Sequence, residues 1–148
     1  MEINTRQFSQ LTPWEIFSMY RLRSEVFVVE QNCVYRDVDE KDLVSWHLLA
    51  LDNGELAGYC RIIPPGVSYA EPSIGRVVIA GHKRRSGLGR ALMNQALNKV
   101  SELFQKQDIV ISAQTYLEPF YKSLGFSSEG SEYDEDGIPH IQMRKRPG

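Results

Sequence analysis

The chain of 148 residues is 42% hydrophobic and 24% charged, with a formal net charge of −2. We expect one domain, residues 1–148, with a sizeable core and no general affinity for nucleic acid. No apolar run approaches the roughly 20 residues that span a bilayer, and no export signal is visible, so no membrane partner is expected. Cys33 and Cys60 form neither a disulfide framework nor a metal-ligand pattern, which favours a cytoplasmic protein without a metal.

The first part of the chain predicts a strand followed by a helix. Residues 1–8 have the composition of a strand. Thr12 has the chemistry of an N-cap, with Pro13 at the first helical position and Glu15 near the place of a capping-box acid. Apolar side chains then recur at helical spacing to about residue 29.

The middle of the chain predicts a hairpin and a buried strand. An irregular acidic segment, 30–43, precedes two apolar runs, 47–51 and 56–63. Asp52-Asn53-Gly54 separates the runs, and this is a strong hairpin signal. The apolar residues 74–80 then predict a buried central strand.

The last part predicts a long helix, a strand at 109–113, a short helix and a final strand near 138–144. One face of the long helix is marked by apolar residues at helical spacing: Leu88, Leu92, Ala96, Val100 and Leu103. Strands and helices thus alternate along the chain, as in an α/β domain.

The most informative stretch is the glycine loop between the buried strand and the long helix, Arg84-Arg85-Ser86-Gly87-Leu88-Gly89-Arg90. Its two glycines carry no Cβ, so backbone N–H groups can approach phosphate oxygens. The following helix adds unpaired N–H groups and the positive end of its dipole. Lys83 and the loop arginines add full charges. The loop therefore predicts a pyrophosphate site.

Two other phosphate-binding loops are excluded by their spacing. A mononucleotide P-loop needs Lys and then Ser or Thr after its last glycine, whereas Arg90 and Ala91 follow Gly89. A dinucleotide fingerprint needs a third small residue, where this chain has Leu92. The remaining pattern, Arg-x-x-Gly-x-Gly after a strand, resembles the pyrophosphate loop of the GNAT N-acetyltransferases.

A second stretch, Tyr116 to Phe126, supports this resemblance. In GNAT enzymes a short helix that ends in Tyr-x-x-x-Gly-Phe occupies this place, and Tyr121, Gly125 and Phe126 match it. Both motifs occur in the family's order, with one helix and one strand between them.

Further matches cover nearly the whole chain and resemble the ElaA-like subgroup. They are residues 26–35, the acids Asp37, Asp39 and Asp42, and the run 136–140. The resemblance implies a mixed α/β domain with a central, mostly antiparallel sheet that is flanked by helices and splayed at its central strands. It also implies acetyl-CoA as co-substrate, whereas the acceptor of this subgroup is generally not known.

The resemblance assigns roles around the thioester. The backbone of Val77, Val78 and Ile79 would pair with the pantetheine arm, and the Ile79 N–H would stabilise the oxyanion. Gln114 stands where many relatives have an Asn that contacts the same arm. Tyr121 is the expected general acid, because a phenol with a pKa of about 10 can protonate a thiolate at neutral pH. A purely structural core aromatic is the alternative for Tyr121.

The general base stays open at this point. Many relatives carry a Glu on the central strand, but residues 74–80 contain no carboxylate. Glu71 lies just before this strand, and His47 and His140 are further candidates because imidazole accepts protons near pH 7. The alternative for His47 is a purely structural role. A water relay to a more distant acid is the alternative to Glu71, His47 and His140 as the base.

Two acidic groups flank the expected acceptor side. The first is Glu30, Asp37, Asp39, Glu40 and Asp42; the second is Glu129, Glu132, Asp134, Glu135 and Asp136. Their negative potential would attract a cationic amine, a polyamine or a basic peptide. A solvated surface without a role in binding is the alternative.

The sequence thus predicts an acetyl-CoA-dependent N-acetyltransferase in which a small-molecule or peptide amine attacks the thioester directly. A homodimer is compatible with the family. Two alternatives stay open: a non-catalytic acyl-CoA-binding or regulatory module, and a protein-interaction domain. The presence of Tyr121 argues against the non-catalytic module, whereas the absence of a carboxylate from the predicted central strand favours it.

Overall fold

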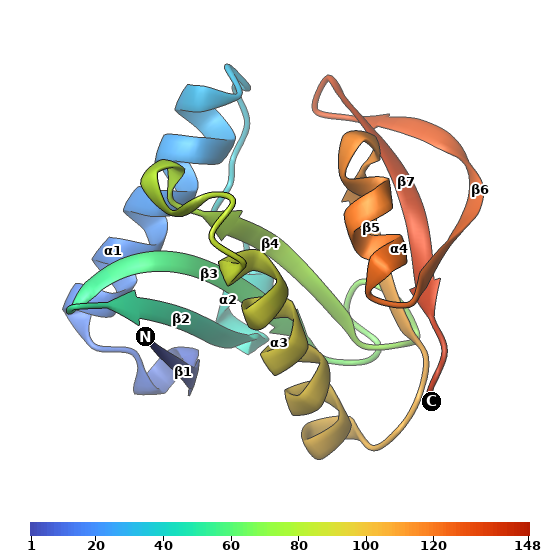
Figure 1. The fold of residues 1–148 in the computed structure, drawn as a ribbon, viewed down its shortest axis with the longest axis horizontal. Helices are drawn as coiled ribbons and strands as arrows, with labels where there is room; N and C mark the ends of the chain where they lie inside the picture. Colours follow the sequence, from blue (N-terminus) through green and yellow to red (C-terminus); the bar gives the residue numbers. More distant parts are fainter.

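Seven strands form two antiparallel sheets in the computed structural model, which describes all of residues 1–148 (Figure 1). The first sheet has the order β1-β2-β3-β4 and the second the order β5-β7-β6. The strands are β1 (Glu2–Gln7), β2 (Trp46–Asp52), β3 (Glu55–Ile63), β4 (Ser73–Ile79), β5 (Ile109–Gln114), β6 (Phe126–Glu135) and β7 (Ile138–Lys145).

Helices cover both sheets. They are α1 (Pro13–Arg23), the π-helix η2 (Ser24–Glu30), α2 (Lys41–Val44), α3 (Leu88–Phe104) and α4 (Glu118–Ser123), with short 3-10 turns η1 (Phe8–Gln10), η3 (Gly81–Lys83) and η4 (Thr115–Leu117). No helix is both long and apolar enough to cross a membrane.

The two sheets separate at the centre of the molecule, as the resemblance to GNAT enzymes implied. The N–H of Val110, near the start of β5, donates at 3.1 Å to the carbonyl of Pro72, which immediately precedes β4. Beyond this point the two strands belong to different sheets, and Figure 1 shows them diverging. The sheet edge of β4 is therefore unpaired along the side that faces β5.

A bulge in β4 lies beside this divergence. Tyr59 of β3 pairs with Val78, and Arg61 pairs with Gly75. Two residues of β4, Arg76 and Val77, therefore lie opposite one residue of β3. Arg76 has a left-handed φ of 52°, and such an extra residue bends the strand that carries it.

The helix predicted at the N-terminus is confirmed, including its cap. Thr12 Oγ1 accepts from the Glu15 N–H at 3.1 Å, and Glu15 Oε1 accepts from the Thr12 N–H at 2.8 Å. The helical segment continues to Glu30, but its last seven residues are π-helical, which the spacing of apolar residues did not predict. π-helical turns are rare and often lie at functional sites.

The hairpin of β2 and β3 is also confirmed. Asn53 and Gly54 have φ values of 52° and 82°, as the mirror-image turn of a tight hairpin requires. The irregular segment that precedes the hairpin contains one short helix, α2.

The prediction of a single strand after α4 is wrong, because β6 and β7 form a second hairpin. All residues of β6 after Glu129 are exposed and most are polar, so the strand lacks the apolar alternation by which strands are recognised. Backbone pairing with β7, rather than burial, holds this strand.

The main core lies between the sheets and α3. The buried face of α3 consists of Leu88, Leu92, Met93, Ala96 and Val100, which confirms four of the five predicted positions; Leu103 is only partly buried. A second core lies under α1 and η2 and includes Met19, Leu22 and Phe27.

Candidate active site

The glycine loop leads from the end of β4 into α3. Gly87 is the N-cap of α3, with φ 85° and ψ 0°, and no side chain caps this helix. The first N–H groups of α3 are therefore free to bind an anion. A Cβ on Gly89 would meet only Phe120 and Ile79, at 3.7 and 3.8 Å, so the protein itself does not require glycine there.

Three of the four cations at the loop already have protein partners. Arg84 forms a bidentate pair with Glu30, at 2.7 and 3.0 Å, and this hydrogen bonding lowers the pKa of Glu30. Lys83 pairs with Asp52. Arg90 donates to Ser123 Oγ at 2.8 Å, and the fourth cation, Arg85, has no partner.

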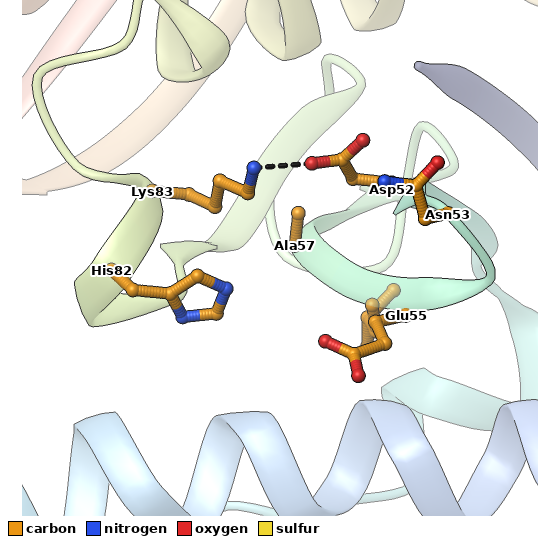
Figure 2. Close-up of a pocket in the computed structure, with 7 residues that line it drawn as sticks. Asp52, Asn53, Glu55, Ala57, His82 and Lys83 are labelled. Carbon is orange, nitrogen blue, oxygen red and sulfur yellow. Dashed lines mark ion pairs between the residues drawn. The ribbon is translucent and has the colours of Figure 1, made fainter.

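A cavity of about 310 Å³ lies beside Lys83 (Figure 2). It lies between the β2–β3 turn and η3, and the Lys83–Asp52 ion pair crosses it. Of the residues that the sequence placed at the pyrophosphate site, only Lys83 lines it. An adjoining cavity of about 570 Å³ runs along α1 and reaches Glu30.

The backbone N–H and C=O groups of one residue at the end of β4, Ile79, face β5. The N–H of Ala80 donates to the Ala57 carbonyl at 2.8 Å. Because antiparallel ladders alternate, the preceding residue, Ile79, turns its N–H and C=O away from β3. Arg84 Nε confirms this orientation, since it donates to the Ile79 carbonyl at 3.2 Å. The Ile79 N–H, which belongs to a partly buried residue, thus faces the space where β4 and β5 diverge; Val77 is also partly buried and Val78 is buried.

The end of β5 contacts the same segment that holds Arg84. Gln114, the last residue of β5, forms a reciprocal amide pair with Gln31, both contacts being 3.3 Å. Glu30 and Gln31 are consecutive, so the C-terminal end of η2 connects the loop after β4 with the end of β5. We call these two residues the strap.

Tyr121 lies on α4 with only 6% of its surface exposed. Its ring packs edge-to-face against Phe120 and Phe126, at 5.2 and 5.9 Å between centroids. Burial raises the pKa of Tyr121, so the phenol stays protonated. The Tyr121 hydroxyl has no hydrogen-bond partner in the protein. The oxygen is also not completely buried, so it is free to donate.

His47 lies fully buried on β2, away from the diverging strands. Its Nε2 donates to the Asp42 carbonyl at 2.8 Å, which leaves Nδ1 to accept from the Tyr59 hydroxyl at 2.6 Å. Burial lowers the pKa of this imidazole. A neutral ring with both nitrogens bonded corresponds to the structural alternative for His47.

The other two candidate bases differ in their surroundings. Glu71 accepts from Arg144 at 2.7 Å and is thus committed to an ion pair. His140 on β7 lies opposite Gln114, at the end of β5. Its Nε2 is 3.4 Å from Glu135. Of the three residues, His140 alone pairs with the end of β5, the strand that diverges from β4.

Known proteins with similar sequences show which family this chain belongs to. A family model described as an acetyltransferase (GNAT) domain matches residues 15–147. The chain belongs to the GNAT acetyltransferase family. A UPF0039 protein of Schizosaccharomyces pombe is 42% identical over 146 residues, which is 97% of this chain and 96% of that protein.

Relatives from bacteria define the subgroup of this GNAT chain. ElaA of Escherichia coli is 37% identical over 93% of this chain and 91% of its own, and its crystal structure gives a TM-score of 0.91. The crystal structure of an acyl-CoA N-acyltransferase from Pseudomonas aeruginosa gives a TM-score of 0.92 at 38% identity, covering 98% of this chain and 99% of that one. The family, the ElaA-like subgroup and the fold predicted from sequence are confirmed, and these relatives support acyltransferase chemistry.

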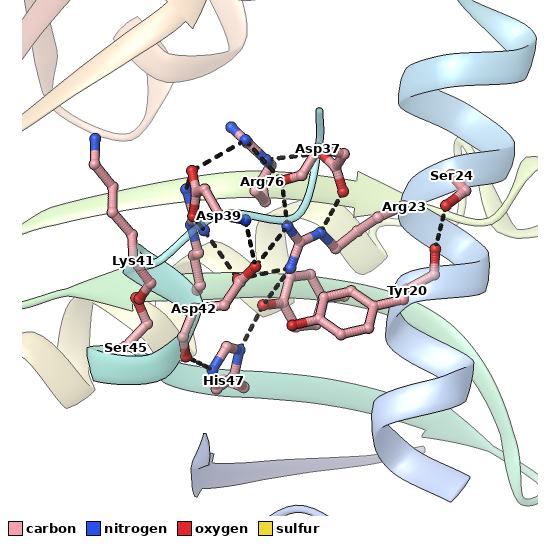
Figure 3. A network of polar contacts seen from close by, with 12 residues as sticks. Tyr20, Arg23, Ser24, Asp37, Asp39, Lys41, Asp42, Ser45, His47 and Arg76 are labelled. Carbon is pink, nitrogen blue, oxygen red and sulfur yellow. Dashed lines mark hydrogen bonds and ion pairs between the residues drawn. The ribbon is translucent and has the colours of Figure 1, made fainter. Parts of the chain in front are cut away.

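The first acidic group of this GNAT chain is largely neutralised inside the protein (Figure 3). Arg23, which is fully buried, binds Asp37 at 2.7 Å and Asp42 at 2.8 Å. Arg61 binds Asp39 at 2.7 Å and Asp42 at 2.9 Å. Burial raises the pKa of Asp42, but the hydrogen bonds and charges of the two arginines outweigh it and lower that pKa overall. These three aspartates therefore do not supply the negative field that the sequence suggested.

A third arginine connects this buried network to the bulge of β4. Arg76 binds Asp37 Oδ1 at 2.8 Å, and its guanidinium lies over the Tyr35 ring, 5.7 Å from the centroid. The network of three arginines and three aspartates thus braces both the acidic segment and the bulge. Sequence analysis missed these arginines, because their partners lie 14 to 39 residues away along the chain.

The second acidic group is divided between several roles. Glu129 binds Arg144 at 2.5 Å and Gln142 at 2.9 Å. Asp134 accepts from the Gly137 N–H at 3.1 Å and so holds the β6–β7 turn. Glu132 is exposed and unpaired, whereas Glu135 faces His140 with 49% of its side chain exposed.

Proposed function

We propose that this protein transfers an acetyl group from acetyl-CoA to a primary amine by direct attack on the thioester. The observation that carries the proposal is the Ile79 peptide, whose N–H faces the divergence of β4 and β5 just before a glycine loop with free helix N–H groups. A thioester carbonyl aligned with this N–H would have its developing oxyanion stabilised.

Apart from His47 and Glu71, each predicted residue takes one role in this proposal. The residues of the glycine loop, Arg84 to Arg90, and the N-terminus of α3 hold the pyrophosphate, while Val77, Val78 and Gln114 contact the pantetheine arm. Tyr121 protonates the leaving thiolate, because its phenol carries a proton and its hydroxyl has no hydrogen-bond partner in the protein. His140 takes the proton of the attacking amine, since it is the candidate base that lies beside the end of β5.

Calorimetric titration with acetyl-CoA and with CoA tests the cofactor site, and thiol release with added amines tests transfer. Micromolar binding and amine-dependent release of CoA are expected. Binding without release would favour the non-catalytic acyl-CoA module, and a folded protein that binds neither ligand would refute the proposal.

Replacing Gly87 by valine is expected to weaken acetyl-CoA binding at least tenfold. Gly87 has a φ of 85°, which costs a β-branched residue about 1–3 kcal/mol, and a side chain there would stand at the helix N-terminus that receives the phosphates. Gly54→Val is the matched control, because Gly54 has a similar φ of 82° and open space around it but lies in the β2–β3 turn. Equal affinities of the two variants would contradict the loop assignment.

Replacing Glu30 by glutamine is expected to strengthen acetyl-CoA binding about two- to fivefold, since exposed ion pairs contribute little. The change frees Arg84 from its carboxylate partner and leaves its charge to the pyrophosphate. Glu25→Gln, on the same π-helix and 64% exposed, is the control for the loss of one negative charge. Weaker binding by the Glu30 variant alone would instead mean that Arg84 must be held by Glu30 for the loop to work.

A further inference from the structure

A compact polar cluster lies where β5, β6 and β7 meet, and the roles given above use only its histidine. Ser112 on β5 is hydrogen-bonded to the Tyr133 hydroxyl on β6 and lies 3.5 Å from Glu135 Oε1. Glu135 Oε2 is 3.4 Å from His140 Nε2, and the His140 ring stacks on Tyr133 at 6.2 Å between centroids. We call Ser112, Tyr133, Glu135 and His140 the β6 cluster.

The tautomer of His140 decides what the cluster can bind. Its Nδ1 is 2.7 Å from the Ile138 carbonyl, which can only accept, so Nδ1 carries a hydrogen. In the neutral ring, Nε2 therefore presents a lone pair toward the Glu135 carboxylate. Two such acceptors are satisfied by a hydrogen between them, which is supplied either by the ring itself or by a bound donor. A primary ammonium ion, with three N–H donors, can supply one to each acceptor.

The Tyr133 phenol stands beside this carboxylate, since the Tyr133 hydroxyl and Glu135 Oε1 both contact Ser112. A second phenol, Tyr69, lies in the loop between β3 and β4, within electrostatic range of both residues. Burial together with the nearby Tyr133 and Glu135 raises the pKa of Tyr69 to about 12. An aromatic ring beside a carboxylate, as Tyr133 is here, favours an organic cation, because ring faces attract positive charge.

The cluster and Tyr121 lie on opposite faces of β5. Ile111 and Ala113 point into the main core that contains Tyr121, so the alternate residues Ser112 and Gln114 point to the other face. Gln114 pairs in register with His140 and contacts the strap through Gln31. An acyl group between β4 and β5 would thus have the acid on one side and the β6 cluster on the other.

We propose that Glu135 and Tyr133 bind the ammonium group of the acceptor and present it to His140, so the acceptor class is a primary aliphatic amine bound as a cation. This inference rests on the proposed acetyl transfer. His140 Nε2 accepts one proton from the ammonium, and the neutral nitrogen forms the C–N bond as the C–S bond breaks. The thiolate leaves with the Tyr121 proton. The nitrogen of the new amide then loses a proton to the Tyr121 phenolate, which restores the phenol. His140 releases to solvent the proton that it took from the ammonium group.

The test compares Glu135→Gln with Glu132→Gln, an exposed and unpaired acid on the same strand. Thiol release is measured with acetyl-CoA and n-butylamine, and acetyl-CoA affinity is measured by calorimetry. Glu135→Gln is expected to raise the KM for n-butylamine at least tenfold, with kcat within threefold and acetyl-CoA affinity unchanged. Glu132→Gln should match the wild type within twofold.

Three results separate this inference from the proposed function. Equal KM values for the two variants would overturn the role of Glu135. Acetyl-CoA binding by the wild type without any acceleration by n-butylamine, spermidine or a lysine-containing hexapeptide would overturn the acceptor class and leave the cofactor site standing. Failure to bind acetyl-CoA would refute the proposed function itself. The ranking of the three amines by kcat/KM distinguishes a small-molecule acceptor from a peptide.

Discussion

Replacing Arg23 by methionine is expected to lower the free energy of unfolding by about 3–5 kcal/mol, the usual loss when one partner of a buried ion pair is removed. The Arg23 guanidinium has no exposed surface, and it binds Asp37, Asp42 and the Asp37 carbonyl (Figure 3). Methionine can fill much of the space, but it cannot neutralise the two carboxylates, which are almost completely buried. Asp42 would keep Arg61 and Asp37 would keep Arg76, but two guanidinium groups would then face three aspartates, so one negative charge of the network would be uncompensated.

Chemical denaturation of the Arg23→Met and Arg21→Met variants measures this effect. Arg21 lies on the same helix and pairs with Glu25 at 3.9 Å, but both side chains are 64% exposed, so its loss should cost less than about 1 kcal/mol. Similar stabilities of the two variants would show that the buried network contributes little. A large loss for Arg23 alone would confirm that it holds the acidic segment to the sheet.

The structure explains why this network was not predicted while the glycine loop was. The loop is a local pattern, and a few consecutive residues determine both its backbone shape and its charge. The network joins α1, the acidic segment, β3 and β4, and each aspartate resembles a solvated acid in the sequence. An arginine next to apolar residues such as Leu22 was the only local signal, and helices carry such arginines on their surfaces too.

The same reasoning accounts for the errors in secondary structure. Thr12 and Asn53-Gly54 predicted their elements correctly, because caps and tight turns are determined by the residues that form them. Strand β6 was missed because its stability comes from pairing with β7, although Asp136-Gly137 is itself a hairpin signal with φ values of 54° and 83°. The π-helical turn was missed because the run of apolar residues continues through it, while the change from i→i+4 to i→i+5 hydrogen bonds leaves no signal in the composition.

The strap shows how the missed elements complete the site. η2 ends at Glu30, so Glu30 and Gln31 reach Arg84 on one side of the divergence and Gln114 on the other. Cys33 then donates to the Asp136 carbonyl at 3.1 Å, which connects the same segment to the β6–β7 turn and thus to the β6 cluster. The segment from η2 to Cys33 therefore connects the cofactor loop with the proposed acceptor site. The buried network holds this segment on one side, and the β6–β7 hairpin holds it on the other.

Replacing Tyr121 by phenylalanine is expected to lower kcat about 100-fold, the lower end of what a general acid contributes. Affinity for acetyl-CoA should stay within twofold, because phenylalanine keeps the edge-to-face contacts with Phe120 and Phe126. Tyr116→Phe is the control, since Tyr116 lies on the neighbouring turn with 70% of its surface exposed. Turnover would be measured by thiol release at saturating acetyl-CoA.

The pH dependence adds a second criterion for the same residue. Burial raises the pKa of Tyr121 above its ordinary value near 10, so the phenol keeps its proton, and its ability to act as an acid, throughout the neutral and mildly alkaline range. Loss of turnover in the Phe variant should therefore be constant from about pH 7 to pH 9 when chemistry limits the rate. An unchanged kcat would remove Tyr121 as the acid and leave its role in the core. A loss that disappears within this pH range would mean that another group, with a pKa inside it, delivers the proton.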